Sequence, residues 1–335
     1  MDILSQSPAK LILSGEHAVV YGSPALAVAV NRYAKCRCNE AESYQIKLTD
    51  LAITCSYSEP ELTGSYQEIC QRLEQFEAGK LPISDLVQSP TDIIVYTIGL
   101  LNDLSGSQTA LQIEISSTIP ISCGLGSSAA IGLAALKSIS SIRNLDITNE
   151  QLFELSLKIE KLTHGNPSGV DSYLCTYGGA VRFQRPMDSV EQSIGIQNFT
   201  LVNTGKPESS TADSVENCRK FADTGIWDSF TDLTERFIAK LNGGSSLDDC
   251  LDEIKENHQL LIDIEVVPQK VQDFISDISF AGNAAKICGA GSLTGDAAGM
   301  VLIAGNQYAL FDSASEYGYE ILQVNTDNEG TVRCE

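Results

Sequence analysis

The sequence predicts an α+β fold built from two domains. Strand-like and helical segments occur in both halves of the chain, but they do not alternate regularly as they do in parallel α/β proteins. With 335 residues the chain is longer than a typical single domain, and its 43% hydrophobic content can fill sizeable cores. A polar stretch at 186–197 separates two strand-like runs. We therefore expect domains over residues 1–188 and 189–335, with the last strands able to return to the first domain.

The first half is expected to contain strands followed by helices. Buried or alternating apolar runs predict the strands, and apolar positions at helical spacing predict the helices. Thr148 followed by Gln151 resembles a capping box, which opens a helix running to about Leu162. The predicted strands are 9–13, 25–30, 34–39, 45–48, 111–116 and 178–183, and the predicted helices are 65–78, 91–103, 127–142 and 148–162.

The second half begins with an apolar strand and continues mainly as helices. Gly243 and Gly244 stop one helix just before a new N-cap, so they do not form a linker between domains. The predicted strands are 199–203, 300–304 and 321–324, and the predicted helices are 212–222, 227–241, 247–263 and 267–278.

The most informative segment is Pro-Ile-Ser-Cys-Gly-Leu-Gly-Ser-Ser-Ala-Ala at 120–130. It lies where a predicted strand gives way to a helix, so free backbone N–H groups and the positive end of the helix dipole face outward together. Glycines let a backbone approach an anion closely, and hydroxyls can bind a phosphate or its metal ion. Gly124, Leu125, Gly126, Ser127 and Ser128 are therefore predicted to bind the phosphates of a nucleotide.

This loop has two other interpretations. The same residues match the G-x-G-x-x-A form of the dinucleotide fingerprint, but more than a hundred residues precede them and Pro120 interrupts the approach. Asp146 lies at about the right distance, but it follows a helix and does not end a second strand. A purely structural glycine turn is the second alternative. No G-x-x-x-x-G-K-[ST] motif occurs in the chain, so it is not a P-loop protein.

Composition limits the partners and the compartment. A formal net charge of −22 argues against nucleic acid or an anionic membrane as a partner, because both select basic surfaces. The ten cysteines form no CxxC pair and no zinc spacing, and the first residues lack the features of a secretory signal. We therefore expect reduced thiols in a cytoplasmic protein.

Three more segments carry residues suited to chemistry. Residues 8–22 place Lys10 at the start of a buried strand and Glu16 and His17 just past its end. Residues 164–171, His-Gly-Asn-Pro-Ser-Gly-Val-Asp, form a tight turn that leads into a helix start. Residues 286–295 contain a second glycine-rich loop. Each segment alone also has a structural explanation, such as a rim lysine, a helix cap or a hairpin turn.

Together, and in this order, the four segments resemble the GHMP small-molecule kinases. Within them, Ser-Gly-Glu-His-Ala-Val-Val-Tyr-Gly at 14–22 and the 164–171 turn are similar to mevalonate kinases. The resemblance spans residues 8 to about 304. It implies an N-terminal nucleotide-binding domain like a ribosomal protein fold, a C-terminal ferredoxin-like domain, and transfer of a phosphoryl group from ATP to the 5-hydroxyl of mevalonate. It also admits a homodimer.

The resemblance implies a role for each site residue. Asp171 would take or orient the proton of the substrate hydroxyl, with Lys10 as its partner, and Mg²⁺ would bind Ser128 and Glu160. ATP is then the co-substrate and Mg²⁺ the cofactor. The implied substrate-binding residues are Glu16, His17, Gly289, Ala290, Gly291 and Thr294.

The chain departs from the family pattern in two places. Glu208 stands in Pro-Glu-Ser-Ser-Thr where mevalonate kinases often have arginine, and the late loop has Leu293 and Asp296 where a glycine run is usual. Four alternatives to a mevalonate kinase stay open. They are a phosphomevalonate kinase, another small-molecule kinase of this family, the related diphosphomevalonate decarboxylase and a non-catalytic binding protein. The decarboxylase is expected to lack the equivalent of Lys10.

Overall fold

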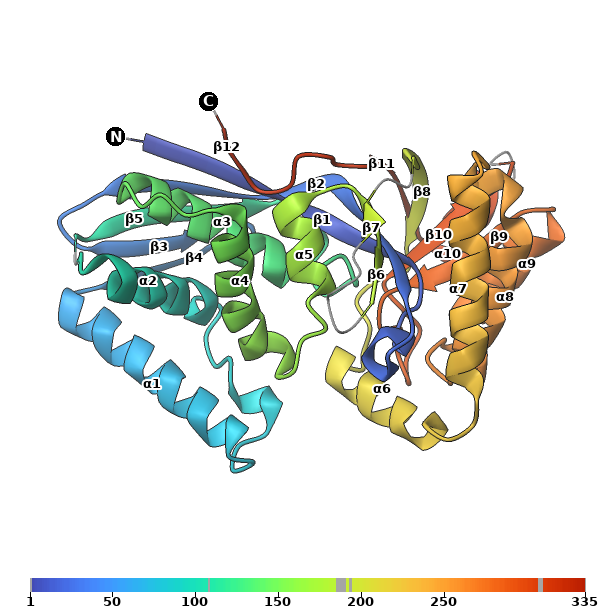
Figure 1. The fold of residues 1–335 in the computed structure, drawn as a ribbon, viewed down its shortest axis with the longest axis horizontal. Coiled ribbons are helices and arrows are strands. Elements are labelled where there is room, and N and C mark those ends of the chain that lie inside the picture. The colour runs from blue at the N-terminus through green and yellow to red at the C-terminus, as the bar shows by residue number, and fades with distance from the viewer. Residues whose placement is uncertain (1, 108, 185–190, 193–194, 307–309, 335) are drawn as a thin grey trace.

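Two β-sheets, each accompanied by helices, form the two lobes seen in Figure 1. The computed structural model describes residues 2–107, 109–184, 191–192, 195–306 and 310–334. The predicted α+β class is confirmed, because helices and mainly antiparallel sheets occur in both lobes. The expected domain boundary, between residues 188 and 189, lies outside the described residues. The domain limits therefore stay a prediction.

The first sheet contains eight of the described strands. Six follow the order β12-β1-β2-β5-β3-β4, β6 also pairs with β2, and β7 pairs with β6. The pairing of β3 with β5 is parallel, and the other pairings in this sheet are antiparallel. Its strands are β1 (Asp2–Ser14), β2 (Ala25–Glu40), β3 (Tyr44–Leu48), β4 (Ile53–Tyr57), β5 (Leu111–Ser117), β6 (Ala180–Phe183), β7 (Glu191–Gln192) and β12 (Val332–Cys334).

Strand β2 corrects one expectation from the sequence, since the strands predicted at 25–30 and 34–39 form a single strand. Its first part is buried on both faces, whereas its second part alternates and buries Ala34, Cys36 and Cys38. The change of pattern between the two parts is accompanied by a register shift against β1 between Pro8 and Ala9. The polar residues between the parts are therefore a bend within one strand and do not form a loop.

Five of the described α-helices accompany the first sheet. Thr148 and Gln151 form the expected capping box, because Gln151 N donates to Thr148 Oγ1 at 3.3 Å and Thr148 N donates to Gln151 Oε1 at 2.9 Å. The first helix starts earlier than predicted, at a second capping box made by Ser58 and Glu61. The helices are α1 (Glu59–Glu77), α2 (Asp92–Ser105), α3 (Ser127–Ile142), α4 (Asn149–His164) and α5 (Val170–Tyr177).

The second sheet has the strand order β11-β8-β10-β9, and all its pairings are antiparallel. Its strands are β8 (Asn198–Asn203), β9 (Ala284–Cys288), β10 (Met300–Ala304) and β11 (Glu320–Asn325). The helices of this lobe are α6 (Thr211–Cys218), α7 (Ile226–Asn242), α8 (Leu251–Asp263), α9 (Gln269–Phe280) and α10 (Leu310–Tyr317). Strands β4, β7, β9 and β12 and helix α10 were not predicted from the sequence.

Strand β1 is covered by helices and also pairs with the last strand of the chain. Helix α3 packs on β1 and β2, and α4 and α5 pack on α3, so the N-terminus of α3 lies over β1. The chain then builds the second lobe and returns, and β12 pairs with the start of β1, so that both termini lie together in Figure 1. Among the described residues, no helix combines the length and the apolar character needed to cross a membrane.

Candidate active site

The predicted phosphate loop lies at the N-terminus of α3, as expected. Gly126 is the N-cap residue of α3, with φ of 71°. Because glycine has no side chain, it does not cap the first N–H groups of the helix. Lys10 N donates to Leu125 O at 3.0 Å, which ties the loop to β1. Ser127 and Ser128 follow as half-buried residues in the first turn. The loop therefore presents backbone donors and two hydroxyls at a helix N-terminus.

Lys10 and Asp171 form an ion pair directly beside this loop. Lys10 Nζ lies 3.1 Å from Asp171 Oδ1, and the two side chains are 6% and 13% exposed. A Cβ at position 126 would lie 2.8 Å from Lys10 Cγ and 3.3 Å from Asp171 Oδ2, so only glycine leaves room for the pair. Asp171 stands in the first turn of α5, where the helix dipole favours a negative charge.

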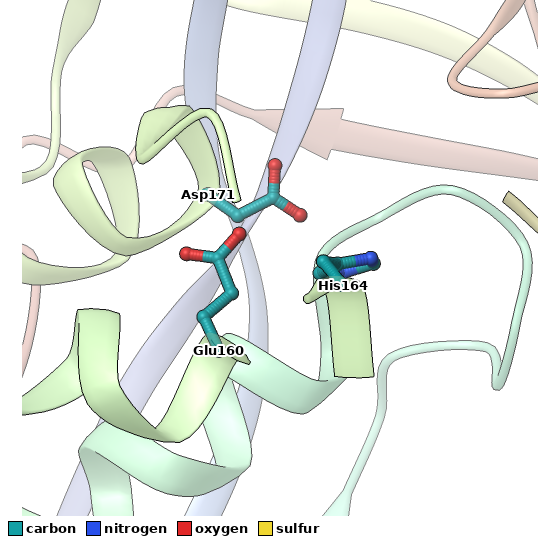
Figure 2. Close-up of side chains that lie close together, drawn as sticks. All are labelled: Glu160, His164 and Asp171. Carbon is teal, nitrogen blue, oxygen red and sulfur yellow. The ribbon is translucent and has the colours of Figure 1, made fainter. Parts of the chain in front are cut away.

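Glu160 and His164 come from the last turn of α4 and face Asp171, as Figure 2 shows. One ligand atom from each of these three side chains lies within 4.8 Å of the other two. Ser172 Oγ donates to Glu160 Oε2 at 2.6 Å. Burial, together with the charge of Asp171, raises the pKa of Glu160 to about 8. Burial lowers the pKa of His164, so its imidazole is neutral at pH 7.

Glu16 and His17 lie in the turn after β1, and they face different partners. Glu16 is 1% exposed and forms an ion pair with Lys286 of β9, which is fully buried. Burial raises the pKa of Glu16, and Lys286 opposes that effect. Lys286 Nζ also donates to Ile12 O at 3.4 Å. In the structure Glu16 therefore connects β1 to the second sheet.

His17 contacts the late glycine loop. Its Nε2 lies 3.1 Å from Ala290 O, and because a carbonyl oxygen only accepts, Nε2 carries the proton. Burial lowers the pKa of His17 to about 4, so the ring is neutral. Its Nδ1 is buried without a hydrogen-bond partner in the described part of the chain. His17 also has φ of 60°, a conformation that non-glycine residues seldom adopt outside functional or strained sites.

The two glycine loops meet backbone to backbone. A Cβ at Gly124 would lie 2.6 Å from Cys288 O, and one at Gly289 would lie 3.0 Å from Gly124 Cα. Both residues have positive φ, which glycine adopts at little cost. A Cβ at Gly291 would lie 2.0 Å from Val266 O, so this residue is also fixed by close backbone contact. The late loop is thereby held against the phosphate loop.

Thr294 follows the part of the late loop that contacts the phosphate loop. It is exposed, and its Oγ1 lies 3.4 Å from Ser209 Oγ. Ser209 also accepts from Leu293 N at 3.1 Å, and Glu208 lies over Gly295, where a Cβ would be 2.4 Å from Glu208 Cδ. The two segments that depart from the family pattern therefore contact each other.

The structure brings together Lys10, Gly126, Asp171 and Glu160, and it also brings His17 to Ala290. Sequence reasoning missed two residues of this region. His164 could have been found from its position four residues after Glu160, which puts both on one face of a helix. The role of Lys286 had no local signal, because its partner Glu16 is 270 residues away.

Comparisons with known proteins agree with this geometry. The model of the GHMP kinases N terminal domain matches residues 92–179. A mevalonate kinase of Thermococcus sibiricus is 32% identical over 225 residues, which cover 66% of this chain and 62% of the relative. A mevalonate kinase of Archaeoglobus fulgidus is 28% identical over 294 residues, covering 86% and 89%. Across three Thermococcus relatives the match spans only 52% to 62% of their length.

The fold has close counterparts among solved structures. The mevalonate kinase of Methanococcus jannaschii superposes with a TM-score of 0.80 at 22% identity, over 98% of this chain and 99% of that one. The chain thus has the fold of these enzymes along nearly its whole length. Residues 92–179 thus match the N-terminal domain of the GHMP kinases, and in sequence and fold the chain is similar to mevalonate kinases.

Proposed function

We propose that this protein transfers a phosphoryl group from ATP to the 5-hydroxyl of mevalonate. The observation that carries the proposal is the Lys10–Asp171 ion pair, which lies against the glycine of a loop that presents uncapped helix N–H groups. Phosphoryl transfer requires positioning and charge stabilisation rather than a covalent role for the protein. The mevalonate kinases that match this chain support the choice of acceptor.

The residues divide the work as follows. The backbone of 124–128 binds the phosphates at the start of α3. Asp171 orients the acceptor hydroxyl and accepts its proton, and Lys10 stabilises the negative charge that develops on that oxygen. His17 offers its unpartnered Nδ1 as an acceptor to a hydroxyl of the substrate. Glu16 contributes by holding the turn that carries His17, since its carboxylate is paired with Lys286.

Mg²⁺ fits the residues next to the loop. The buried carboxylate of Glu160 lies close to the carboxylate of Asp171, and burial together with the charge of Asp171 raises the pKa of Glu160, so a cation held between them would offset both effects. Glu160 and the hydroxyl of Ser128 would hold the ion together with phosphate oxygens, which suits a hard cation. When bound, Mg²⁺ neutralises charge on the phosphates. Removing it with EDTA should abolish turnover, and added Mg²⁺ should restore it.

A phosphorylated acceptor is the main alternative. Phosphomevalonate carries an extra dianionic group, which would need additional basic residues. Glu208 instead places an exposed carboxylate beside the late loop. We therefore expect Glu208→Arg to improve the KM for an anionic acceptor, whereas Glu208→Gln should have a smaller effect in the same direction.

The test is ADP release from Mg-ATP with four acceptors in parallel: mevalonate, 5-phosphomevalonate, galactose and homoserine. Turnover that depends on mevalonate is expected. Turnover with phosphomevalonate alone would keep the kinase mechanism but overturn the acceptor. Absence of turnover with all four would overturn the proposed activity. The family also suggests a homodimer, which sedimentation of the purified protein would test.

A further inference from the structure

The Glu160–His164–Asp171 cluster contains a ligand that Mg²⁺ does not need. Mg²⁺ prefers oxygen ligands, whereas imidazole nitrogen suits divalent d-block ions such as Mn²⁺, Co²⁺ and Zn²⁺. The three side chains each bring one ligand atom within 4.8 Å of the others, and Figure 2 shows them close together on α4 and the start of α5. The cluster therefore offers one nitrogen and two carboxylate groups in the space of a single ion.

The backbone fixes this convergence. Glu160 and His164 are four residues apart on α4, so they project from one face of the helix. The chain then turns through Gly165 and Gly169, both with positive φ, and places Asp171 in the first turn of α5. A Cβ at Gly165 would lie 2.5 Å from Phe76 Cζ, so the turn is held by packing. The backbone of α4, the turn and α5 therefore fixes the relative positions of the three proposed ligands.

Neighbouring side chains orient both carboxylates. Ser172 Oγ donates to Glu160 Oε2, and Lys10 Nζ contacts Asp171 Oδ1. Such partners orient metal ligands in many sites, while the second carboxylate oxygen faces the ion. His164 has no side-chain hydrogen bond among the described residues, so a ring nitrogen can meet an ion without giving up a protein partner. Lys10 is the charge that opposes a cation here, and it contacts only one of the two carboxylates.

We propose that Glu160, His164 and Asp171 form a site that binds one divalent d-block cation in the absence of nucleotide, and binds it more tightly than Mg²⁺. The site shares Glu160 and Asp171 with the proposed kinase function. Metal binding is measured without ATP or acceptor, so the inference and the proposed function can fail independently.

The experiment is a titration of the nucleotide-free protein with Co²⁺, followed by its visible absorption bands. The wild type is expected to bind one Co²⁺ per chain, and His164→Gln should weaken that affinity by at least about tenfold. His258→Gln is the matched control, because it removes another partly buried histidine far from the cluster in sequence, and it should bind as the wild type does. Mg²⁺ should displace Co²⁺ only at large excess.

Three results would overturn the proposal. Equal Co²⁺ affinity in wild type and His164→Gln would remove His164 from the site. A strong thiolate charge-transfer band in the near ultraviolet would place the ion at one of the ten cysteines instead. The wild type gives a second measurement in case the variant does not fold, since the chain has only three histidines. Mn²⁺ should broaden the imidazole proton signals of His164 well before those of His258, and equal broadening of both would contradict the proposal.

Discussion

Two buried lysine–carboxylate pairs involve β1 and the turn that follows it, and they differ in access to solvent. Lys10 and Asp171 are 6% and 13% exposed and lie beside the phosphate loop. Lys286 and Glu16 are 0% and 1% exposed and join β9 of the second sheet to the turn after β1. The chemistry of the pairs is the same. The difference teaches that access decides which pair can meet a substrate and which can only hold the lobes together.

The sealed pair belongs to a wider contact between the lobes. Ser14 Oγ lies 2.6 Å from Thr234 Oγ1 and accepts from Asn257 Nδ2 at 2.8 Å, and all three residues are buried. Through these contacts and Lys286, the end of β1 is fixed against α7, α8 and β9. Since Lys10 lies on β1, the Lys286–Glu16 pair helps to fix the position of Lys10 relative to the second lobe.

The largest effect is expected from breaking the accessible pair. Asp171→Asn keeps the size of the side chain but removes the base, so kcat should fall by about 10²–10⁴-fold. The free energy of unfolding should fall less than it does when the sealed pair is broken, because Asp171 and Lys10 keep some contact with solvent. Steady-state ADP release and urea unfolding on the same preparation measure both. Loss of stability without loss of kcat would reverse the assignment of the two pairs.

Breaking the sealed pair should act on stability instead. Lys286→Met leaves Glu16 buried without its partner, which should lower the free energy of unfolding by about 3–5 kcal/mol. The double variant Lys286→Met/Glu16→Gln removes both charges and should recover much of that loss. Urea unfolding of the two variants and the wild type tests this. Equal stability of single variant and wild type would show that the pair does not hold the lobes.

Gly126 tests whether the accessible pair depends on its close fit. Gly126→Ala places a methyl group against Lys10 and Asp171 and should lower kcat by roughly 10–100-fold through misplacement of the pair. Gly225→Ala is a matched control, because Gly225 is also a helix N-cap with φ of 74° but has open space around it. If both variants lost the same activity, backbone strain rather than contact with the pair would be the cause.

The smallest effect concerns pH. Burial first, and then the charge of Lys286, lower the pKa of His258 to about 4. A histidine with a depressed pKa stabilises the fold above its unfolded pKa of about 6.5, and that contribution is lost as the pH falls toward 4. His258→Gln should therefore reduce the acid loss of stability between pH 6.5 and 4 by roughly 1–2 kcal/mol. Parallel slopes for wild type and variant in urea unfolding would contradict this.

The sequence alone was enough to predict the fold class and the segments that meet at the site. Glycines and hydroxyls at a strand–helix junction can be recognised locally, because their use there has a physical reason that involves no distant residue. It was insufficient where a residue depends on a distant partner. Lys286 makes β9 look polar, and only its pairing with Glu16 across the lobes explains a fully buried lysine in a strand. The sequence places Cys36 and Cys38 in a separate short strand, because the residues at the bend of β2 are not buried and interrupt its hydrophobic pattern.

The central claim is that the Lys10–Asp171 pair performs the chemistry, and Lys10→Met tests it most directly. ADP release with Mg-ATP and mevalonate should be measured beside the affinity for ATP. The account predicts that turnover falls by about 10²-fold or more while ATP binding is retained. Turnover within a few-fold of the wild type would contradict it.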